Sequence, residues 1–338
     1  MRKGFNPKRD KEILDGIFFH QVIIPVYIPN QEGYFTDCFA IFKYCLQSIF
    51  KTSHKKTFFT IVNNGSCKEV QLYLDDLFNS NLIHELIHTT NIGKLNAILK
   101  AISGNNFPLV TITDADVFFC DSWQQATYKV FEAFPKTGVV STTPNSKGIR
   151  YYTSNVLLEK LCSKKLQFTK VVNPKAMRSF AESIGTPKLF NEYHLSKYLT
   201  ISNGNDVAVV GAGHFSATYR GEIFSNLKKR NTIYSLGGTS ENDILDKPVV
   251  EMGLWRLSTQ DNFTYHMGNV KENWMEEKIK ELNENTSTFD CPKNSNVSSN
   301  KFVIWFKINF FSRIIYNHFI WKIFLQFKGL SKKETNNY

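Results

Sequence analysis

Short β-branched runs alternate with amphipathic stretches along most of the chain, and this alternation restricts the fold more than any other feature. Strands are predicted at residues 20–27, 57–62, 109–113, 138–143 and 207–210, with helices at 35–50, 67–78, 91–102 and near 220–230. This order predicts an α/β fold, with a Rossmann-like, mostly parallel sheet flanked by helices. A chain of 338 residues is long enough for one such domain and an appendage.

Three chemically notable clusters fall at the carboxyl ends of predicted strands. They lie at residues 25–30, 63–66 and 114–116. The carboxyl ends of parallel strands meet at one edge of a sheet, where α/β proteins bind their ligands. The sequence therefore predicts one binding site built from these three clusters.

The third cluster contains two aspartates, Asp114 and Asp116, one residue apart after the apolar run LVTIT. Two carboxylates brought together at a buried strand end repel each other, and a divalent cation removes that cost. Oxygen ligands suit Mg²⁺ or Mn²⁺, whose remaining positions are filled by water and substrate phosphates. An isolated Asp-x-Asp pair is also typical of a solvated turn, but the apolar residues 117–119 indicate that the chain returns to the core here.

Four segments, taken in order, resemble family 2-type glycosyltransferases of the GT-A fold. They are IIPVY in the first strand, IVNNGS closing the second, NIGKLNAILKAI on a helix, and VTITDADVFF around the aspartates. The resemblance covers roughly residues 21–269 and implies a GT-A catalytic domain at residues 20–282. It also implies a nucleotide-diphosphate-sugar donor, with a UDP-sugar as the first expectation, and transfer to a glycan or lipid-linked hydroxyl.

The same resemblance implies roles for individual donor-site residues. Pro25, Val26 and Tyr27 are expected to line the nucleotide base pocket, and Asn63 replaces an aspartate that contacts the base in the family. Two further residues, Lys94 and Gly213, are expected beside the donor, the glycine in a loop that packs under the donor sugar.

Metal and acid-base roles are implied as well. Asp114 is expected to contact the ribose or the metal water shell, Asp116 to ligate the metal, and His266 to complete the metal site. The segment GGTSENDILD resembles the family's Glu-Asp motif, with Asp243 as the expected base and Glu241 as the second candidate. A base opposite the leaving group implies inversion at the anomeric carbon.

The net charge of +11 is concentrated at the two ends of the chain, including the basic segment at residues 1–19. Charged flanks around a balanced middle argue against a continuous nucleic-acid groove. The six scattered cysteines form no zinc-type spacing and are expected to be reduced. Because no apolar run follows the basic N-terminus, a secretory signal is not expected, and a cytoplasmic location is predicted.

The C-terminal part divides into a polar linker at residues 283–300 and an aromatic, basic, helical tail at 301–338. Charged residues interrupt the tail too often for a span of about 20 apolar residues. Two interpretations remain: an amphipathic helix at the membrane interface, or a helix docked on the catalytic domain. The first predicts a peripheral membrane enzyme of surface polysaccharide assembly.

Two other functions are compatible with parts of this pattern. A nucleotidyltransferase shares the α/β sheet and acidic ligands, but residues 28–33 lack the glycine-rich, basic loop expected for that class. A non-catalytic glycan-binding or membrane-binding module is the other alternative, and the carboxylates Asp114, Asp116 and Asp243 argue against it.

Overall fold

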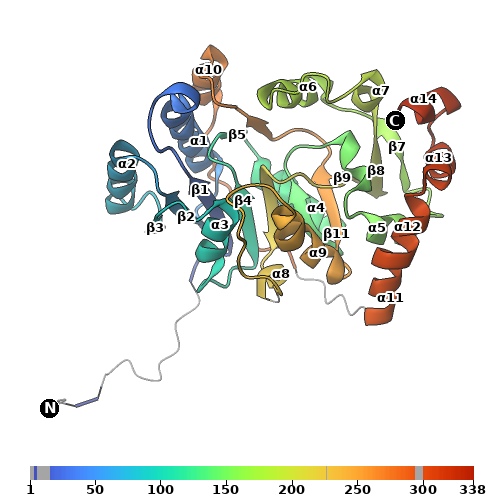
Figure 1. The fold of residues 1–338 in the computed structure, drawn as a ribbon, viewed down its shortest axis with the longest axis horizontal. Helices are drawn as coiled ribbons and strands as arrows, with labels where there is room; N and C mark the ends of the chain where they lie inside the picture. Colours follow the sequence, from blue (N-terminus) through green and yellow to red (C-terminus); the bar gives the residue numbers. More distant parts are fainter. Residues whose placement is uncertain (1–3, 6–15, 226, 294–299) are drawn as a thin grey trace.

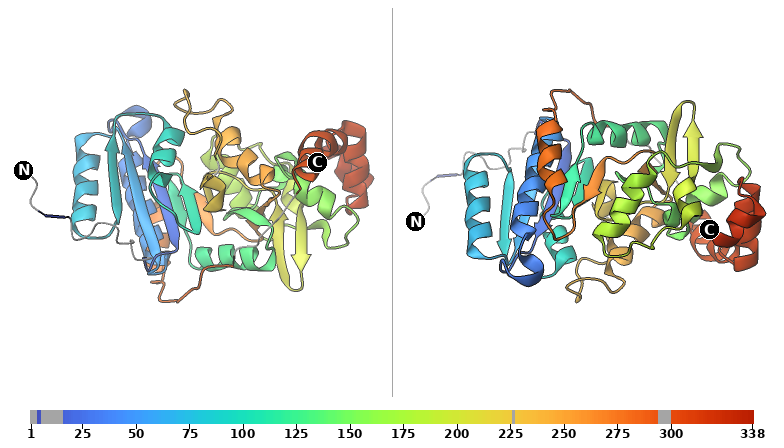
Figure 2. Two further views of the ribbon diagram at one scale, coloured as in Figure 1. Left: turned by 90° about the horizontal axis from the view of Figure 1, so that it is seen from below. Right: turned by 90° about the horizontal axis from the view of Figure 1, so that it is seen from above.

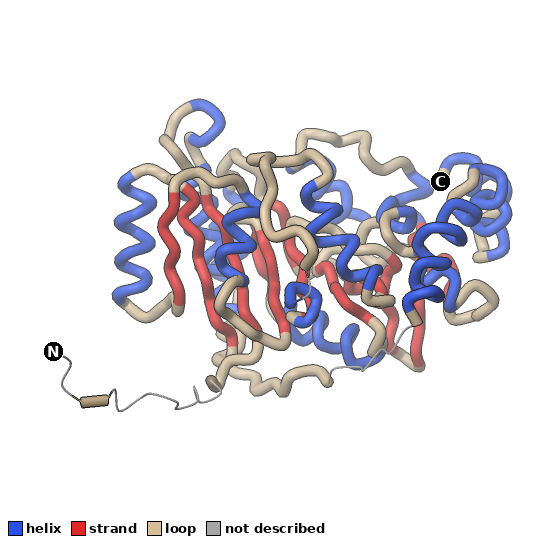
Figure 3. Tube along the Cα trace, turned by 60° about the horizontal axis from the view of Figure 1, so that its bottom comes forward, coloured by secondary structure: helices blue, strands red, loops and turns tan. Residues whose placement is uncertain are grey.

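The computed structural model describes residues 4–5, 16–225, 227–293 and 300–338 (Figure 1). A ten-stranded sheet runs through the described part of the molecule (Figure 3). Its strand order is β3 (Glu85–Thr89), β2 (Thr57–Asn64), β1 (His20–Val26), β4 (Leu109–Thr113), β10 (Ser216–Arg220), β6 (Thr137–Ser141), β11 (Trp255–Thr259), β9 (Asp206–Val210), β8 (Lys197–Asn203) and β7 (Leu166–Lys170).

Parallel pairing is concentrated in the half of the sheet that carries the three polar clusters. Strands β3, β2, β1 and β4 are all parallel, with Ile23 of β1 opposite Thr60 of β2 and Ile112 of β4. Beyond β4 the pairs are antiparallel, except for the parallel pair β6 and β11. The predicted α/β class with a helix-flanked sheet is confirmed, and the antiparallel half extends it. The sequence prediction missed β7, β8, β10 and β11 of this sheet. It also missed β3, whose segment ELIHT is only partly buried.

Strand β1 shows how the sheet separates two hydrophobic cores. Side chains alternate across a strand, so Val22 and Ile24 pack on one face and Ile23 on the other. The first face is covered by α1 (Cys38–Thr52), α2 (Lys68–Asn79) and α10 (Asn273–Glu281). The second face is covered by α3 (Lys94–Ile102), α8 (Glu222–Ser225) and α9 (Lys247–Glu251).

The helix predicted near residues 220–230 is wrong beyond Ser225. Helix α8 ends there, and the next helical segment is the π-helix η3 (Asn242–Asp246). The described residues between them form a loop that is held by hydrogen bonds to Asn96 of α3. The Asn96 side-chain amide donates to the Thr232 carbonyl, and its oxygen accepts from the Thr232 backbone N–H. Bonds to a neighbouring helix thus replace the bonds that a longer helix would form internally.

The remaining elements pack on both halves of the sheet. A two-stranded sheet of β5 (Val117–Phe119) and β12 (Thr264–His266) lies apart from the main sheet. The remaining helical segments are η1 (Gly33–Phe35), α4 (Trp123–Ala133), η2 (Ser146–Arg150), α5 (Ser154–Glu159), α6 (Pro174–Ser183) and α7 (Glu192–Ser196).

The C-terminal helices lie at the opposite end of the molecule from α2 (Figure 2). They are α11 (Lys301–Trp305), η4 (Phe306–Phe311), α12 (Ser312–Ile315), α13 (His318–Phe327) and α14 (Lys332–Asn337). Trp321, Phe324 and Leu325 are buried in the same core as the antiparallel strands, and Lys307 pairs with Glu159 at 2.5 Å. None of the helices described is both long enough and apolar enough to cross a bilayer.

Candidate functional site

A cavity of about 250 Å³ opens at the carboxyl ends of β1 and β4. Its walls include Pro25, Val26, Tyr27, Lys94 and the aspartates Asp114 and Asp116. These residues come from three separate predicted segments, and the parallel register of β1 and β4 brings them together. The fold therefore gathers most of the residues that the sequence assigned to the donor.

Two of the predicted donor residues do not line this cavity. Asn63 is buried, and its side chain accepts a hydrogen bond from the Ser66 backbone N–H and contacts His88. The next residue on the strand, Asn64, faces the cavity instead. Gly213 lies in the loop after β9, where an added Cβ would be 3.7 Å from the Ser141 hydroxyl.

Asp114, Asp116 and His266 form a compact group beside the cavity. Their ligand atoms all lie within 4.8 Å of one another, and the His266 Nε2 atom is 3.5 Å from Oδ2 of Asp116. The register of the small sheet explains this meeting, because β12 pairs His266 with Val117, the residue after Asp116. The backbone N–H of Met267 also donates to the Asp116 carbonyl at 2.8 Å.

The electrostatics of this group favour a bound cation. Burial raises the pKa of Asp116 to about 6, His266 opposes that rise, and Asp114 adds to it. Oδ1 of Asp116 is buried and accepts no hydrogen bond within the part of the chain that the structure describes. A buried carboxylate oxygen without a donor is costly, and a metal ion would satisfy it. Two carboxylates and an imidazole fit Mn²⁺ or Mg²⁺.

Lys94 is fixed at the N-terminus of α3 by the residue before it. Gly93 has φ +85°, and an added Cβ would lie only 2.9 Å from the Ser235 backbone. The close approach lets the Lys94 backbone N–H donate to the Ser235 carbonyl at 3.0 Å. Burial alone would lower the pKa of Lys94, but Asp114 outweighs it and the pKa is raised. The ammonium group therefore stays charged beside the aspartates.

The two candidate bases, Glu241 and Asp243, lie in different surroundings. Glu241 is 3.9 Å from the Lys94 ammonium group and 3.6 Å from Nδ1 of His214. Asp243 instead pairs with Lys247 and, at 3.0 Å, with Lys229. Both lysines lower the pKa of Asp243 to about 2. Glu241 is thus connected to the aspartate group, whereas Asp243 is occupied by two lysines away from it.

Three further residues of this region were missed by the sequence analysis: His214, Asp246 and Arg256. The His214 Nε2 atom is 2.7 Å from Asp246, and the Arg256 guanidinium is 2.8 Å from the same carboxylate oxygen. One signal was present, since the apolar strand WRLST contains a single arginine that must be paired when buried. Asp246 ends the segment GGTSENDILD and His214 follows Gly213, but neither residue was assigned a role from the sequence.

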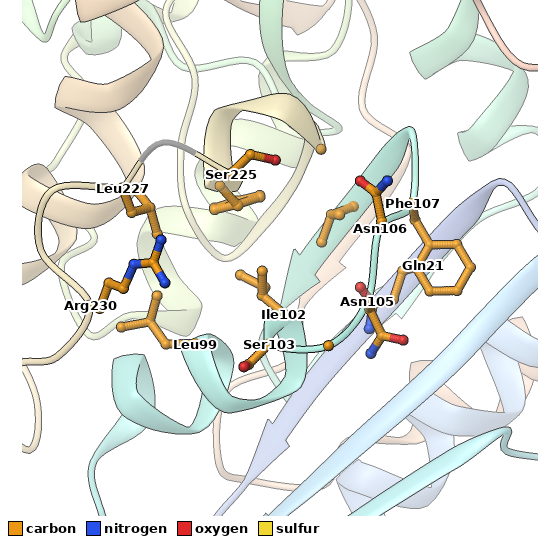
Figure 4. A pocket seen from close by; sticks show the side chains of 14 residues that line it. Gln21, Leu99, Ile102, Ser103, Asn105, Asn106, Phe107, Ser225, Leu227 and Arg230 are labelled. Atoms are coloured by element: carbon orange, nitrogen blue, oxygen red, sulfur yellow. The ribbon is translucent and has the colours of Figure 1, made fainter. Parts of the chain in front are cut away.

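A second cavity, of about 290 Å³, lies at the other end of these strands (Figure 4). It is lined by Gln21 and Val110 near the starts of β1 and β4, with Leu99 and Arg230 on the opposite wall. Its described lining residues include no carboxylate, histidine or cysteine. The group of Asp114, Asp116 and His266 lies at the other cavity, at the carboxyl ends of the strands.

The folded chain has low-level similarity to solved glycosyltransferase structures. It is 14% identical to a mannosyltransferase from Pyrobaculum calidifontis in complex with GDP-Man and Mn²⁺, with a TM-score of 0.42, over 77% of this chain and 59% of that one. It is 11% identical to residues 1–349 of S. aureus TarS in complex with UDP-GlcNAc, also with a TM-score of 0.42, over 94% of this chain and 69% of that one. The chain thus spans less than two thirds of the mannosyltransferase.

Sequence comparison gives a more direct assignment. No curated protein matches the chain. The family model described as glycosyl transferase family 2 matches residues 22–197, which is more than half of the sequence. This range contains most of the first strand, Lys94 and both aspartates of the candidate metal site. The chain belongs to glycosyl transferase family 2.

Proposed function

We propose that this protein is a metal-dependent glycosyltransferase that moves a sugar from a nucleotide-diphosphate-sugar donor to an acceptor hydroxyl. One observation carries the proposal: Asp114, Asp116 and His266 meet beside a cavity whose walls include Tyr27 and Lys94. A site for a nucleoside diphosphate requires carboxylates that bind a cation, a lysine that binds phosphate, and an aromatic wall that covers the base. The donor proposed first is a UDP-sugar.

The three ligands would hold Mn²⁺ or Mg²⁺ between the strand end and the donor. When bound, the ion offsets the negative charge that develops on the departing nucleoside diphosphate. Lys94 adds a positive charge on the same side, since its ammonium group lies 2.5 Å from Asp114. The tyrosine ring of Tyr27 is 41% exposed and is available to cover a nucleotide base.

Deprotonation of the acceptor hydroxyl is proposed for Glu241, with Asp243 as the second candidate. The salt bridges from Lys229 and Lys247 leave Asp243 a weak base, whereas Glu241 lies beside Lys94 at the aspartate group. Direct displacement with this base would invert the anomeric carbon. NMR of the product tests the stereochemistry, and a retained configuration would rule out a base-assisted single displacement.

We further propose that the acceptor is a glycan or a lipid-linked sugar and that the enzyme acts at the cytoplasmic membrane surface in polysaccharide assembly. The two faces of helix α13 in the tail differ. One face supports docking on the catalytic domain, and the other supports binding at the membrane interface. Trp321 and Phe324 of α13 pack into the core, while Phe319, Ile323 and Phe327 are between 54% and 71% exposed. Their spacing of four residues places these three on one helix face. Exposed aromatics beside lysines and arginines are typical of interfacial helices.

Calorimetry with a panel of nucleoside diphosphates, with and without Mn²⁺, tests the central proposal. We expect association that depends on the metal and is lost when Asp116 is replaced by asparagine. A donor-hydrolysis assay then separates the alternatives, because a non-catalytic module would bind without releasing sugar. A nucleotidyltransferase would release pyrophosphate from a nucleoside triphosphate. Absence of any metal-dependent nucleotide binding would contradict the proposed function.

A further inference from the structure

A series of alternating charges, buried at its inner end, leads from the antiparallel half of the sheet to the proposed base. Arg256 of β11 lies 2.8 Å from Oδ1 of Asp246, and Nε2 of His214 lies 2.7 Å from the same oxygen. On its other side, Nδ1 of His214 is 3.6 Å from Oε2 of Glu241. Glu241 in turn lies 3.9 Å from Lys94. No residue of this series except Glu241 and Lys94 was assigned a role from the sequence.

The inner end of the series is rigid. The side chains of Arg256 and Asp246 are only 2% and 3% exposed. The Arg256 guanidinium also donates to the carbonyls of Ala212 at 2.7 Å and Tyr151 at 3.4 Å. Separating the pair would leave a buried charge without a partner, which is strongly destabilising. Arg256 and Asp246 therefore hold each other in place. Asp246 therefore offers a fixed acceptor to the histidine.

The loop before His214 is equally constrained. Gly211 has φ +107°, and an added Cβ would meet the backbone of Gly148 at 2.8 Å. Its backbone N–H donates to the Arg256 carbonyl at 2.9 Å. The position of the His214 ring is thus fixed by the close backbone packing of this loop and by the hydrogen bond to Asp246. Carboxylates lie on both sides of the ring, at 2.7 Å from Nε2 and 3.6 Å from Nδ1, and this arrangement favours the protonated imidazole.

Glu241, in contrast, is more exposed than Arg256 and Asp246. It follows a loop in which Gly237 and Gly238 both have positive φ, and it directly precedes the π-helix η3. Its side chain is 33% exposed. Single π-helical turns are frequently found at functional sites. A carboxylate at such a position needs a side-chain partner to hold it toward the site, and His214 is the partner anchored on the rigid side.

We infer that His214 is a positioning residue that holds the Glu241 carboxylate beside Lys94 and keeps it ionised for proton abstraction. The inference rests on the proposed function, because it assumes that Glu241 is the base. It assigns Asp246 and Arg256 the task of fixing the ring, so that Nε2–H faces Asp246 and Nδ1–H faces Glu241. The acceptor proton would pass to the Glu241 carboxylate only, and no proton transfer by His214 itself is required.

The rate of sugar transfer by the His214→Ala variant tests this role. We expect kcat to fall by at least about tenfold, which is part of the roughly 10²–10⁴-fold contribution of a general base, while KM for the donor changes little. Because the His214 side chain is 25% exposed, added imidazole can reach the space left by the substitution and should restore part of the rate. His318→Ala, on the exposed surface of α13, is the matched control and should keep the wild-type rate.

The pH profile gives a second readout, which a purely structural effect would not change. The charged groups around Glu241 are Lys94 and His214, with Asp246 and Arg256 behind the histidine and Tyr219 of β10 nearby. His214→Gln keeps a polar side chain but removes the positive charge. We expect the acidic limb of the kcat/KM profile to move to higher pH by roughly one unit, the lower end of the effect of a neighbouring cation.

The outcomes separate failure of this inference from failure of the proposed function. If Glu241→Gln is inactive while both His214 variants keep the wild-type kcat and pH profile, the positioning role is wrong and the function stands. If Glu241→Gln transfers sugar at the wild-type rate, Glu241 is not the base. Should His214→Ala fail to fold, as judged by circular dichroism, the His214→Gln profile decides, and an unshifted acidic limb overturns the inference.

Discussion

The ammonium group of Lys94 lies 2.5 Å from Oδ1 of Asp114, and both side chains are less than a quarter exposed. A bound divalent cation and this lysine therefore interact with the same carboxylate. We predict that Lys94→Met strengthens the binding of Mn²⁺ alone, because a competing positive charge is removed. The same variant should weaken nucleoside diphosphate binding by about 10–100-fold, the value of one hydrogen bond to a charged group.

Calorimetry of Mn²⁺ alone, and of nucleoside diphosphate at saturating Mn²⁺, measures the two effects separately. Lys100→Met is the matched control, since Lys100 is an exposed lysine in the last turn of the same helix. It should change neither affinity. A Lys94→Met protein that binds metal more weakly and donor equally well would show that Lys94 serves the fold and not the phosphate.

Replacing Asp116 by asparagine should have opposite effects on stability and on metal binding. We expect the affinity for Mn²⁺ to fall by at least about tenfold, since even outer-shell partners of metal ligands have effects of this size. Without added metal, the variant should melt at a higher temperature than wild type, because burial and Asp114 disfavour the charged form of this carboxylate. Thermal denaturation with and without Mn²⁺ tests both, and Asp76→Asn on the exposed side of α2 is the control. Equal metal-dependent stabilisation of both variants would remove Asp116 from the ligand set.

Glu241 and Asp243 can be distinguished by isosteric substitution. Glu241→Gln should reduce the transfer rate by about 10²–10⁴-fold, the usual contribution of a general base. Asp243→Asn should keep most of the activity, because its partners are the surface lysines Lys229 and Lys247. Sugar transfer measured at saturating donor tests this difference. A loss confined to Asp243→Asn would return the base to the position first expected from the sequence.

The stability of the protein should depend on pH through His214. Burial alone would lower its pKa, but the hydrogen bond to Asp246 and the nearby Glu241 carboxylate outweigh burial and raise the pKa to about 9, from an ordinary value of 6.5. A raised pKa means that the folded state binds the proton more tightly than the unfolded state does. The resulting stabilisation is complete below pH 6.5 and is lost as the pH rises through about 9.

Denaturant unfolding of wild type and His214→Gln over this pH range measures the effect. The difference in free energy of unfolding between the two proteins should be largest below pH 6.5 and should shrink toward pH 9. A difference that stays constant across the range would mean that His214 is not protonated in the folded protein.

Vesicle binding should depend on the exposed face of α13. Replacing Phe319, Ile323 and Phe327 by serine should weaken binding to vesicles containing anionic lipid by at least about tenfold, because each buried side chain contributes about 1.5–3 kcal/mol. The same substitutions of Leu72 and Phe78, which are 50% and 44% exposed on α2, are the control. Co-sedimentation measures the bound fraction, and equal binding by wild type and the α13 variant would contradict membrane association. Deleting the whole tail is less informative, because it would expose the core.

Much of the candidate site follows from short sequence patterns. Asp114 and Asp116 were predicted as ligands because they follow the strand LVTIT, and β4 has the predicted bounds. His266 was placed with them by resemblance, and the pairing of β12 with β5 brings it there. Strand β3 and the end of α8 were predicted less well, because their positions depend on contacts with β2 and α3, which leave no mark on their own sequences.

Local patterns were enough to identify the α/β class, the family and the paired aspartates, because strand periodicity and the acidic motif are properties of neighbouring residues. Packing alone decides that Glu241 lies beside Lys94 whereas Asp243 pairs with Lys229 and Lys247. The link from Arg256 through Asp246 to His214 joins residues on three different elements, and burial makes that link strong. Long-range electrostatics of this kind depends on distances in the folded chain, which residue order does not contain.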